Sequence, residues 1–189
     1  TNMLSSVIKT LKINYNRRVP KAKIFELGMT YIPVENQKLP DEKIVVALGM
    51  YGDVDFFDLK GIVQNLLDDL GIKNAEFEAD TESPAYHPGR CAKICAGGKI
   101  IGTIGQLHPD IAENFKLDTD IYCGELDFNT IMEFSTFERE YKSLPKFPAS
   151  NRDIALVIDK SISVGKIEKI LNDTKHGILE SYKLFDVYE

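Results

Sequence analysis

The sequence has little cysteine, no long apolar run and no common hydrolase signature. Its three cysteines are an odd number with no secretory leader before them, so we expect no disulfide framework and a reducing, cytoplasmic setting. No run approaches the ~18 apolar residues of a membrane-spanning helix, and we expect no membrane partner. The patterns G-x-S-x-G and H-E-x-x-H are both absent.

The composition that is present is typical of a globular protein. Hydrophobic residues make up 43% and charged residues 28% of the 189 residues, and this length suffices to bury a core. The net charge is −6, a poor balance for wrapping polyphosphate unaided, so we expect no DNA partner. One cationic stretch stands out in this acidic background. Between Lys9 and Lys23 there are six Lys or Arg residues and no carboxylate.

Hydrophobic periodicity predicts an α+β fold with an antiparallel sheet, because strands outnumber helices and hairpins join many of them. Asp58 precedes an apolar stripe that Gly71 ends, which predicts a helix with Asp58 as its N-cap. Gly97 and Gly98 predict a tight hairpin turn with positive φ. The other predicted elements are helices at 2–15, from Pro109 onward and at 128–134, and strands at 23–32, 43–51, 90–96, 99–105 and 120–127.

Phe25, Leu27, Met29 and Tyr31 alternate with smaller or polar residues in the first predicted strand. Alternation with period two places these four side chains on one face of a sheet. We therefore expect that this face is buried.

A domain junction is predicted over residues 138–150, which contain two prolines and no clean periodicity. The pattern beyond it predicts a strand at 152–159, a helix at 163–171 capped by Ser163, and a strand at 178–188. We therefore expect one domain over 1–140 and an incomplete second domain over 141–189. The first residue is not Met and the chain ends within a predicted strand, which favours a piece of a longer protein.

Three groups of residues could carry chemistry. His87, Cys91 and Cys95 are evenly spaced, but on a strand the two thiols would lie about 13 Å apart, too far for one zinc ion. We expect no metal site and three small buried cysteines. His87 and His108 each precede a proline, and an acid–base role would need an orienting carboxylate that the sequence does not identify. For Arg90, a carboxylate partner in the fold or across an interface is favoured over a substrate contact.

Five groups of residues occur in a fixed order: IFELGMTYI, VDFFDLKGIVQNLLDDLG, YHPGRCAKI, IGTIGQLHPDI, and YKSLPKFPASNRDIALVID with LFDVY. With these motifs the sequence resembles the bacterial phenylalanyl-tRNA synthetase β subunit family from about residue 4 to residue 189. The resemblance implies a class II aminoacyl-tRNA-synthetase-like antiparallel sheet flanked by helices. It also implies that a partial ferredoxin-like β-α-β unit follows, the first half of an anticodon-binding domain.

The class II chemistry of the family can be compared with these residues. Class II synthetases hold ATP phosphates with arginines of their second and third signature motifs. Residues 23–31, which resemble the second motif, contain no arginine, and Gly102 to Gly105 continue into Gln106, Leu107 and His108. We therefore expect a pseudo-catalytic core with no catalytic residue of its own, inactive alone.

The resemblance also implies the partners. In the family, an α subunit performs aminoacylation with ATP and magnesium, two α and two β chains assemble, and the intact C-terminal domain contacts tRNA-Phe. No cofactor is expected on this chain itself. The family motifs nominate Phe147 and Arg152 for tRNA contacts, and as interface or structural residues His87, Pro88, Gly89, Arg90, His108 and Pro109.

Two other functions stay open on the sequence. One is a stand-alone small-molecule-binding or regulatory module with a pocket over its sheet. The other is a small enzyme that uses His87 or His108, which requires a carboxylate within hydrogen-bond reach of a ring nitrogen.

Overall fold

The structure is a computed structural model that describes residues 2–139, 141, 146–160, 162–174 and 178–188. The chain divides into two compact units, residues 1–140 and residues 141–189. Unit 1 contains α1 (Leu4–Asn16), β1 (Ala22–Ile32), β2 (Asp41–Tyr51), α2 (Phe56–Asp69), β3 (Glu76–Ala79), β4 (Tyr86–Ala96), β5 (Lys99–Leu107), α3 (Pro109–Asn114), β6 (Ile121–Asp127) and α4 (Phe128–Phe134).

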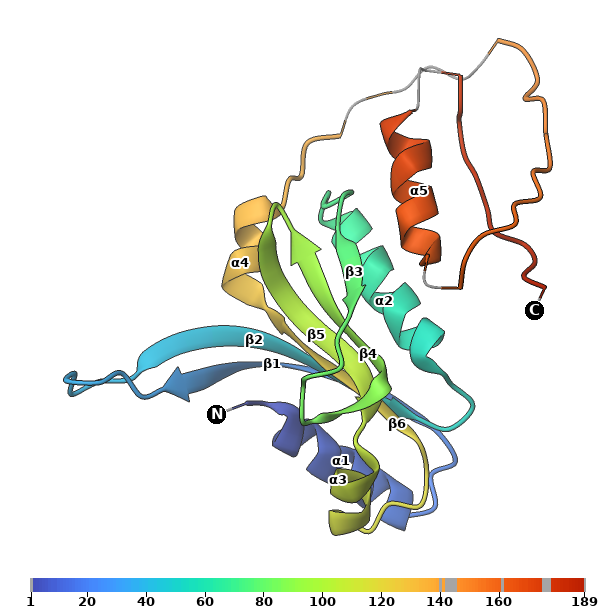
Figure 1. The fold of residues 1–189 in the computed structure, drawn as a ribbon. Helices are drawn as coiled ribbons and strands as arrows, with labels where there is room; N and C mark the ends of the chain where they lie inside the picture. Colours follow the sequence, from blue (N-terminus) through green and yellow to red (C-terminus); the bar gives the residue numbers. More distant parts are fainter. Residues whose placement is uncertain (1, 140, 142–145, 161, 175–177, 189) are drawn as a thin grey trace. The chain divides into compact units, whose positions relative to one another are not determined.

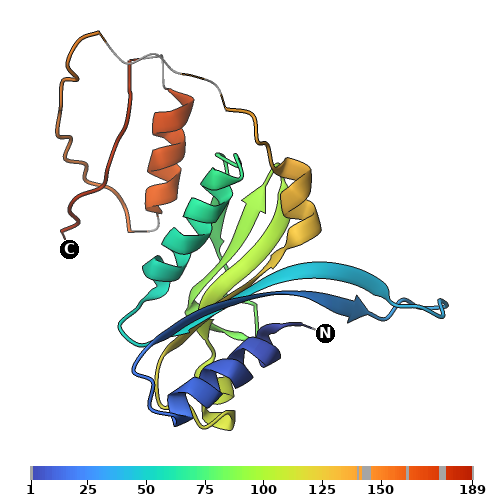
Figure 2. The ribbon, with the colours of Figure 1, turned by 180° about the vertical axis from the view of Figure 1, so that it is seen from behind.

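The six strands of unit 1 form one sheet in the order β1-β2-β6-β5-β4-β3, and each adjacent pair is antiparallel (Figure 1). The predicted antiparallel α+β fold is therefore confirmed. Helices α1 and α3 lie on one side of the sheet, whereas α2 and α4 lie on the other (Figures 1 and 2). The sequence pattern did not indicate β3, whose four residues form one edge of the sheet.

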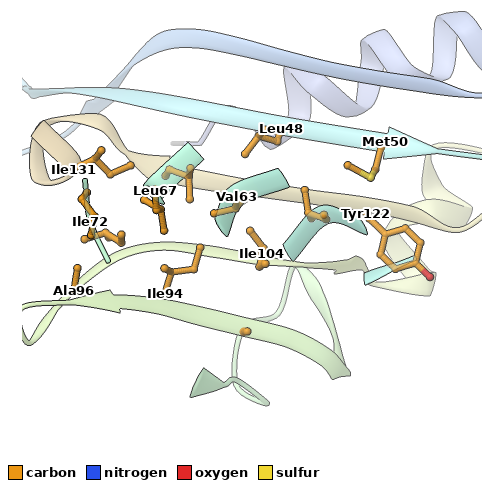
Figure 3. Close-up of a cluster of buried hydrophobic side chains, with 14 residues drawn as sticks. Leu48, Met50, Val63, Leu67, Ile72, Ile94, Ala96, Ile104, Tyr122 and Ile131 are labelled. Carbon is orange, nitrogen blue, oxygen red and sulfur yellow. The ribbon is translucent and has the colours of Figure 1, made fainter. Parts of the chain in front are cut away.

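The larger core lies between the sheet and helices α2 and α4. Figure 3 shows Val63 and Leu67 of α2 pointing toward strand residues that include Leu48 and Ile104. Ile131 of α4 closes one end of this cluster (Figure 3). The second core lies beneath α1, where Leu4, Val7, Ile8 and Leu11 are buried against the opposite face of the sheet.

Helix α2 begins one turn earlier than predicted. Asp55, not Asp58, is its N-cap residue, and its carboxylate accepts a hydrogen bond from the Asp58 N–H at 2.9 Å. The Asp58 carboxylate accepts in return from the Asp55 N–H at 2.8 Å, which completes a capping box. Two acidic residues three apart fit this reciprocal arrangement, and the predicted cap is its second member.

The apolar face of β1 was predicted wrongly. Phe25, Leu27, Met29 and Tyr31 do share a face, but their exposed fractions are 76%, 56%, 42% and 49%. The other face of β1 packs against α1, where an added Cβ at Gly28 would meet the Met3 side chain. We call the four exposed side chains the β1 stripe.

Unit 2 contains helix α5 (Val164–Asp173). The strands predicted at 152–159 and 178–188 are not formed in the described residues of this unit. Those two predictions of secondary structure are therefore wrong. Ser163 precedes α5 as predicted but makes no side-chain cap hydrogen bond. A sheet of only two strands packed on one helix is at best marginally stable, which explains why these strands do not form. Ile154 and Val157, which such a sheet would bury, are exposed.

Candidate functional site

The YHPGR motif forms the first part of β4, where the pairing with β5 is irregular between Tyr86 and Cys91. The Gly89 N–H donates to Nδ1 of His87 at 3.0 Å, within the stretch where the ladder is interrupted. Pro88 has no N–H to donate, which suits this irregular segment. These residues shape the local backbone, and one of the two ring nitrogens of His87, Nδ1, accepts from a backbone donor.

Arg90 belongs to a chain of polar contacts that crosses the sheet. Its Nη1 donates to Oε1 of Gln106 at 2.6 Å, and Nε2 of Gln106 donates to Oδ1 of Asp120 at 2.8 Å. Gln106 is buried, so this pairing satisfies an amide that water does not reach. Burial and the nearby Asp120 carboxylate raise the pKa of Tyr122, whereas the Arg90 guanidinium opposes that rise.

No described carboxylate forms a salt bridge with Arg90. The expected carboxylate partner within the fold is thus replaced by Gln106, which links the guanidinium to Asp120 indirectly. A substrate phosphate or carboxylate would have to compete with this network. Arg90 is also the one arginine in the six strands described.

His108 is the N-cap residue of α3, and Pro109 occupies the first helical turn. Its Nδ1 accepts from the Asp110 N–H at 3.3 Å and lies 3.6 Å from Oδ2 of Asp110. Its own backbone N–H donates to the Ala85 carbonyl at 3.0 Å, which ties α3 to the start of β4. In the described part of the chain, neither His87 nor His108 forms a hydrogen bond with a carboxylate oxygen, so the hypothesis of a histidine enzyme gains no support.

The glycines after β4 serve close backbone packing. An added Cβ at Gly105 would lie 2.9 Å from the Arg90 carbonyl oxygen, and one at Gly102 would lie 2.6 Å from the Glu125 carbonyl oxygen. Both glycines face neighbouring strands that leave no space for a side chain. This stretch is therefore built as sheet and not as a phosphate-binding loop.

Cysteine chemistry is suppressed by burial. Burial raises the pKa of the Cys91 thiol to about 11 and that of the Cys123 thiol to about 12, so both stay protonated at neutral pH. Cys95 is only half-buried, unlike the prediction of three buried cysteines. Within the described part of the chain, no group of three His, Cys, Asp or Glu side chains is placed to hold a metal ion.

The candidate tRNA-contacting residues of unit 2 are exposed. Phe147 is 81% exposed, and Arg152 donates from Nη1 to the Asn151 carbonyl at 2.8 Å. Neither side chain belongs to a formed strand. The structure does not bring these two residues into a shaped site.

One feature that the sequence reasoning missed is a hollow of about 450 Å³ at the C-terminal end of α1, lined in part by Tyr15 and Tyr51. A smaller one, of about 260 Å³, adjoins α3 and residues 117–121. The cationic stretch that contains Arg18 is the one feature of the sequence that points to the first hollow. The hollow itself could not be predicted, because Tyr51, which also lines it, belongs to the distant strand β2. In the described residues, none of the helices is both long and apolar enough for a bilayer.

The sequence matches two family models. Residues 1–128 match the phenylalanyl tRNA synthetase beta chain CLM domain. The chain belongs to the phenylalanyl-tRNA synthetase β chain family. Residues 145–189 match the ferredoxin-fold anticodon binding domain, although the described residues of this region form only the helix.

Named relatives agree with this family. The chain is 42% identical over 190 residues to the phenylalanine–tRNA ligase β subunit of Clostridium acetobutylicum, and 40% identical to that of Clostridium tetani. The Bacillus subtilis β subunit is 31% identical over 200 residues. All of this chain is covered in these comparisons, but only 24 to 25% of each relative, so the chain spans about a quarter of their length.

The fold is similar to that of Desulfitobacterium hafniense PylSc, a pyrrolysyl tRNA synthetase, with a TM-score of 0.57 at 11% identity. The likeness covers 69% of this chain and 48% of PylSc. This phenylalanyl-tRNA synthetase β chain member therefore has a class II synthetase-like sheet, as predicted.

Proposed function

We propose that the chain is a non-catalytic supporting part of the β subunit of a phenylalanine–tRNA ligase, which joins phenylalanine to tRNA-Phe with ATP. Residues 1–140 serve as the pseudo-catalytic scaffold, and residues 141–189 begin the anticodon-binding domain. The whole enzyme, which works in the cytoplasm, uses ATP and magnesium through its α subunit. The family match over residues 1–128 supports the assignment to this enzyme.

The single observation that carries the non-catalytic role concerns Arg90. Adenylate formation in class II synthetases depends on guanidinium groups aimed at the ATP phosphates. Arg90 is the one arginine in the six described strands, and its Nη1 already donates to Gln106. The six described strands therefore offer a single guanidinium, and part of it is already committed to a buried amide, whereas a triphosphate requires several such groups.

The β1 stripe supports assembly with the α subunit. Monomeric proteins seldom expose a contiguous row of large apolar side chains, and such rows mark interaction surfaces. Phe25, Leu27, Met29 and Tyr31 form such a row on an edge strand, and the β1–β2 hairpin projects from the rest of the sheet (Figure 1). We propose that the α subunit covers the stripe in an assembly of two α and two β chains.

The YHPGR and HP motifs then have a structural role. His87, Pro88, Gly89 and Arg90 set the irregular start of β4, and His108 with Pro109 starts α3. In unit 2, Phe147 and Arg152 would contact tRNA only weakly, because neither side chain belongs to a formed strand in the described residues. Aromatic stacking and phosphate contacts are the chemistry available to these two side chains.

Pyrophosphate exchange into ATP, with phenylalanine present, tests the non-catalytic role. We expect no exchange by the isolated chain, and exchange when α and full-length β subunits are combined. Exchange by the isolated chain would contradict the proposal.

Co-purification of α with full-length β subunit tests the partner. Leu27→Asp in the β1 stripe should reduce the recovered α subunit at least several-fold, because a buried unpaired carboxylate is costly. Phe57→Asp is the matched control, since Phe57 is 71% exposed on α2 and its replacement should leave assembly intact. Equal recovery with both variants would remove the stripe from the interface.

A further inference from the structure

The hollow at the C-terminal end of α1 is lined by the partly exposed ring of Tyr15, with the buried Tyr51 behind it. The rings of Tyr15 and Tyr51 meet edge to face, with centroids 5.9 Å apart and planes at 82°. The Tyr51 hydroxyl donates to the Val19 carbonyl at 2.8 Å, and the Tyr15 hydroxyl donates to the Asp118 carbonyl at 3.2 Å. These bonds fix both rings. The complete lining is Tyr15, Asn16, Arg18, Val19, Pro20, Tyr51 and Thr119.

A row of cations leads to this hollow along α1. Lys9, Lys12 and Asn16 are three and four residues apart, so they follow one flank of the helix. Asn16 lines the hollow, and Arg18 lines it just after the helix with a left-handed φ of 59°. Arg17 is exposed beside them. We call Lys9, Lys12, Arg17 and Arg18 the α1 cationic flank.

The α1 cationic flank is not neutralised within the described chain. None of its four side chains forms a salt bridge with a described residue. The whole chain carries a net charge of −6, so an uncompensated basic row runs against the general charge of the molecule. Such a row attracts an anionic partner.

The combination of cations and an aromatic hollow favours a single-stranded or looped nucleic acid over an acidic protein. Phosphates can meet lysine and arginine, and an unstacked base can lie against the partly exposed ring of Tyr15, which the buried Tyr51 holds in place. We propose that the α1 cationic flank and its hollow form an RNA-backbone contact on unit 1, separate from the anticodon-binding unit. The choice of RNA rests on the proposed function, which makes tRNA the polyanion that the enzyme must hold.

Asp118 limits the strength of this contact. Its side chain is exposed, it lies next to Thr119 of the hollow, and its backbone carbonyl accepts from Tyr15. A carboxylate near the path of a phosphate repels it. Removing this one charge therefore gives a test with the opposite sign from removal of the cations.

Binding of tRNA-Phe to the enzyme assembled from α and full-length β subunits tests the proposal, with affinity measured over a range of salt concentrations. Lys12→Ala with Arg18→Ala should weaken binding roughly 5-fold and lower the slope of log affinity against log salt by about 1.5. Asp118→Asn should strengthen binding roughly twofold at low salt. Lys73→Ala, an exposed lysine outside the flank, should change neither quantity.

The outcomes separate this proposal from the proposed function. If the wild-type enzyme charges tRNA-Phe but the double variant keeps its affinity and salt slope, the RNA contact is refuted while the enzyme assignment stands. If the double variant instead loses α subunit with RNA affinity per assembled enzyme unchanged, the flank faces an acidic protein surface and the proposal is wrong. A second double variant, Lys9→Ala with Lys12→Ala, leaves Arg18 and its backbone unchanged. If it also weakens tRNA binding while its thermal unfolding matches that of the wild type, misfolding at Arg18 is not the cause of the loss of affinity.

Discussion

The carboxylate of Glu125 accepts a hydrogen bond from the backbone N–H of Met3, the residue that precedes α1. The N–H of Leu4 donates to the same carboxylate. The Met3 side chain makes no capping hydrogen bond. The free N–H groups at the start of the helix therefore find their acceptor in Glu125 of strand β6. A negative group at this end also interacts favourably with the helix dipole.

Glu125→Ala should therefore lower the free energy of unfolding by about 1 kcal/mol, the usual cost of a lost N-cap acceptor. Chemical denaturation of the chain at neutral pH measures this change. Glu125→Gln keeps an oxygen acceptor and should cost less than Glu125→Ala. Equal stability of the alanine variant and the wild type would show that α1 needs no cap from β6.

The same residue predicts a pH dependence. Burial raises the pKa of Glu125 despite the two N–H donors, so the folded chain binds this proton more tightly than the unfolded chain does. The contribution of Glu125 to stability is therefore largest below its ordinary pKa and declines as pH rises through the raised value. In Glu125→Gln this decline should disappear from denaturation curves measured between pH 4 and pH 8. A decline of the same size in both proteins would contradict the assignment.

Asp80 predicts a pH dependence of the opposite sign. The Ser83 hydroxyl, the Glu82 N–H and the Lys93 ammonium group lower the pKa of Asp80 from 3.8 to about 2. Between these two values the unfolded chain binds more protons, so the stabilisation is present above pH 4 and is lost as pH falls toward 2. Asp80→Asn should flatten the acid limb of the stability curve. Lys93→Ala, which keeps the hydroxyl and amide donors, should flatten it only partly, and an unchanged limb in Asp80→Asn would refute the effect.

Two adjacent glycines give a matched pair in the β4–β5 turn. Gly97 and Gly98 both have positive φ, 56° and 79°, so alanine at either position is strained by about 1 kcal/mol. An added Cβ at Gly97 would also overlap the Phe134 ring, whereas one at Gly98 meets nothing within 4 Å. Gly97→Ala should thus unfold at a lower denaturant concentration than Gly98→Ala. The reverse order would mean that α4 moves away without cost.

Local patterns in the sequence predicted what depends on local contacts. Residues 128–134 form a helix as predicted, Pro109 begins α3, and the Gly97–Gly98 turn has the expected backbone. The motif order also identified the family and its class II-like sheet. Helix periodicity, proline placement and glycine turns act over a few residues, so one sequence contains them fully.

Long-range relations were less accessible to prediction. Alternation in β1 showed that Phe25 and Leu27 share a face, but it could not show that this chain leaves that face uncovered. The cap on α1 comes from Glu125, 122 residues away from Met3. Two of the missed site features, Tyr51 in the hollow and Gln106 beside Arg90, likewise depend on strand pairing that no local pattern contains. In unit 2, residues such as Ile154 carry a strand pattern but have no described strand beside them.

Strand β1 pairs along eleven residues with β2, and no other described strand lies on its outer side. A long edge strand with an apolar face can pair with strands of other molecules. Native proteins prevent this pairing by covering the edge strand with another element or subunit. If the α subunit covers β1, as we propose, copies made in excess of that partner are exposed to fibrous aggregation, and their solubility depends on matched production of the two subunits.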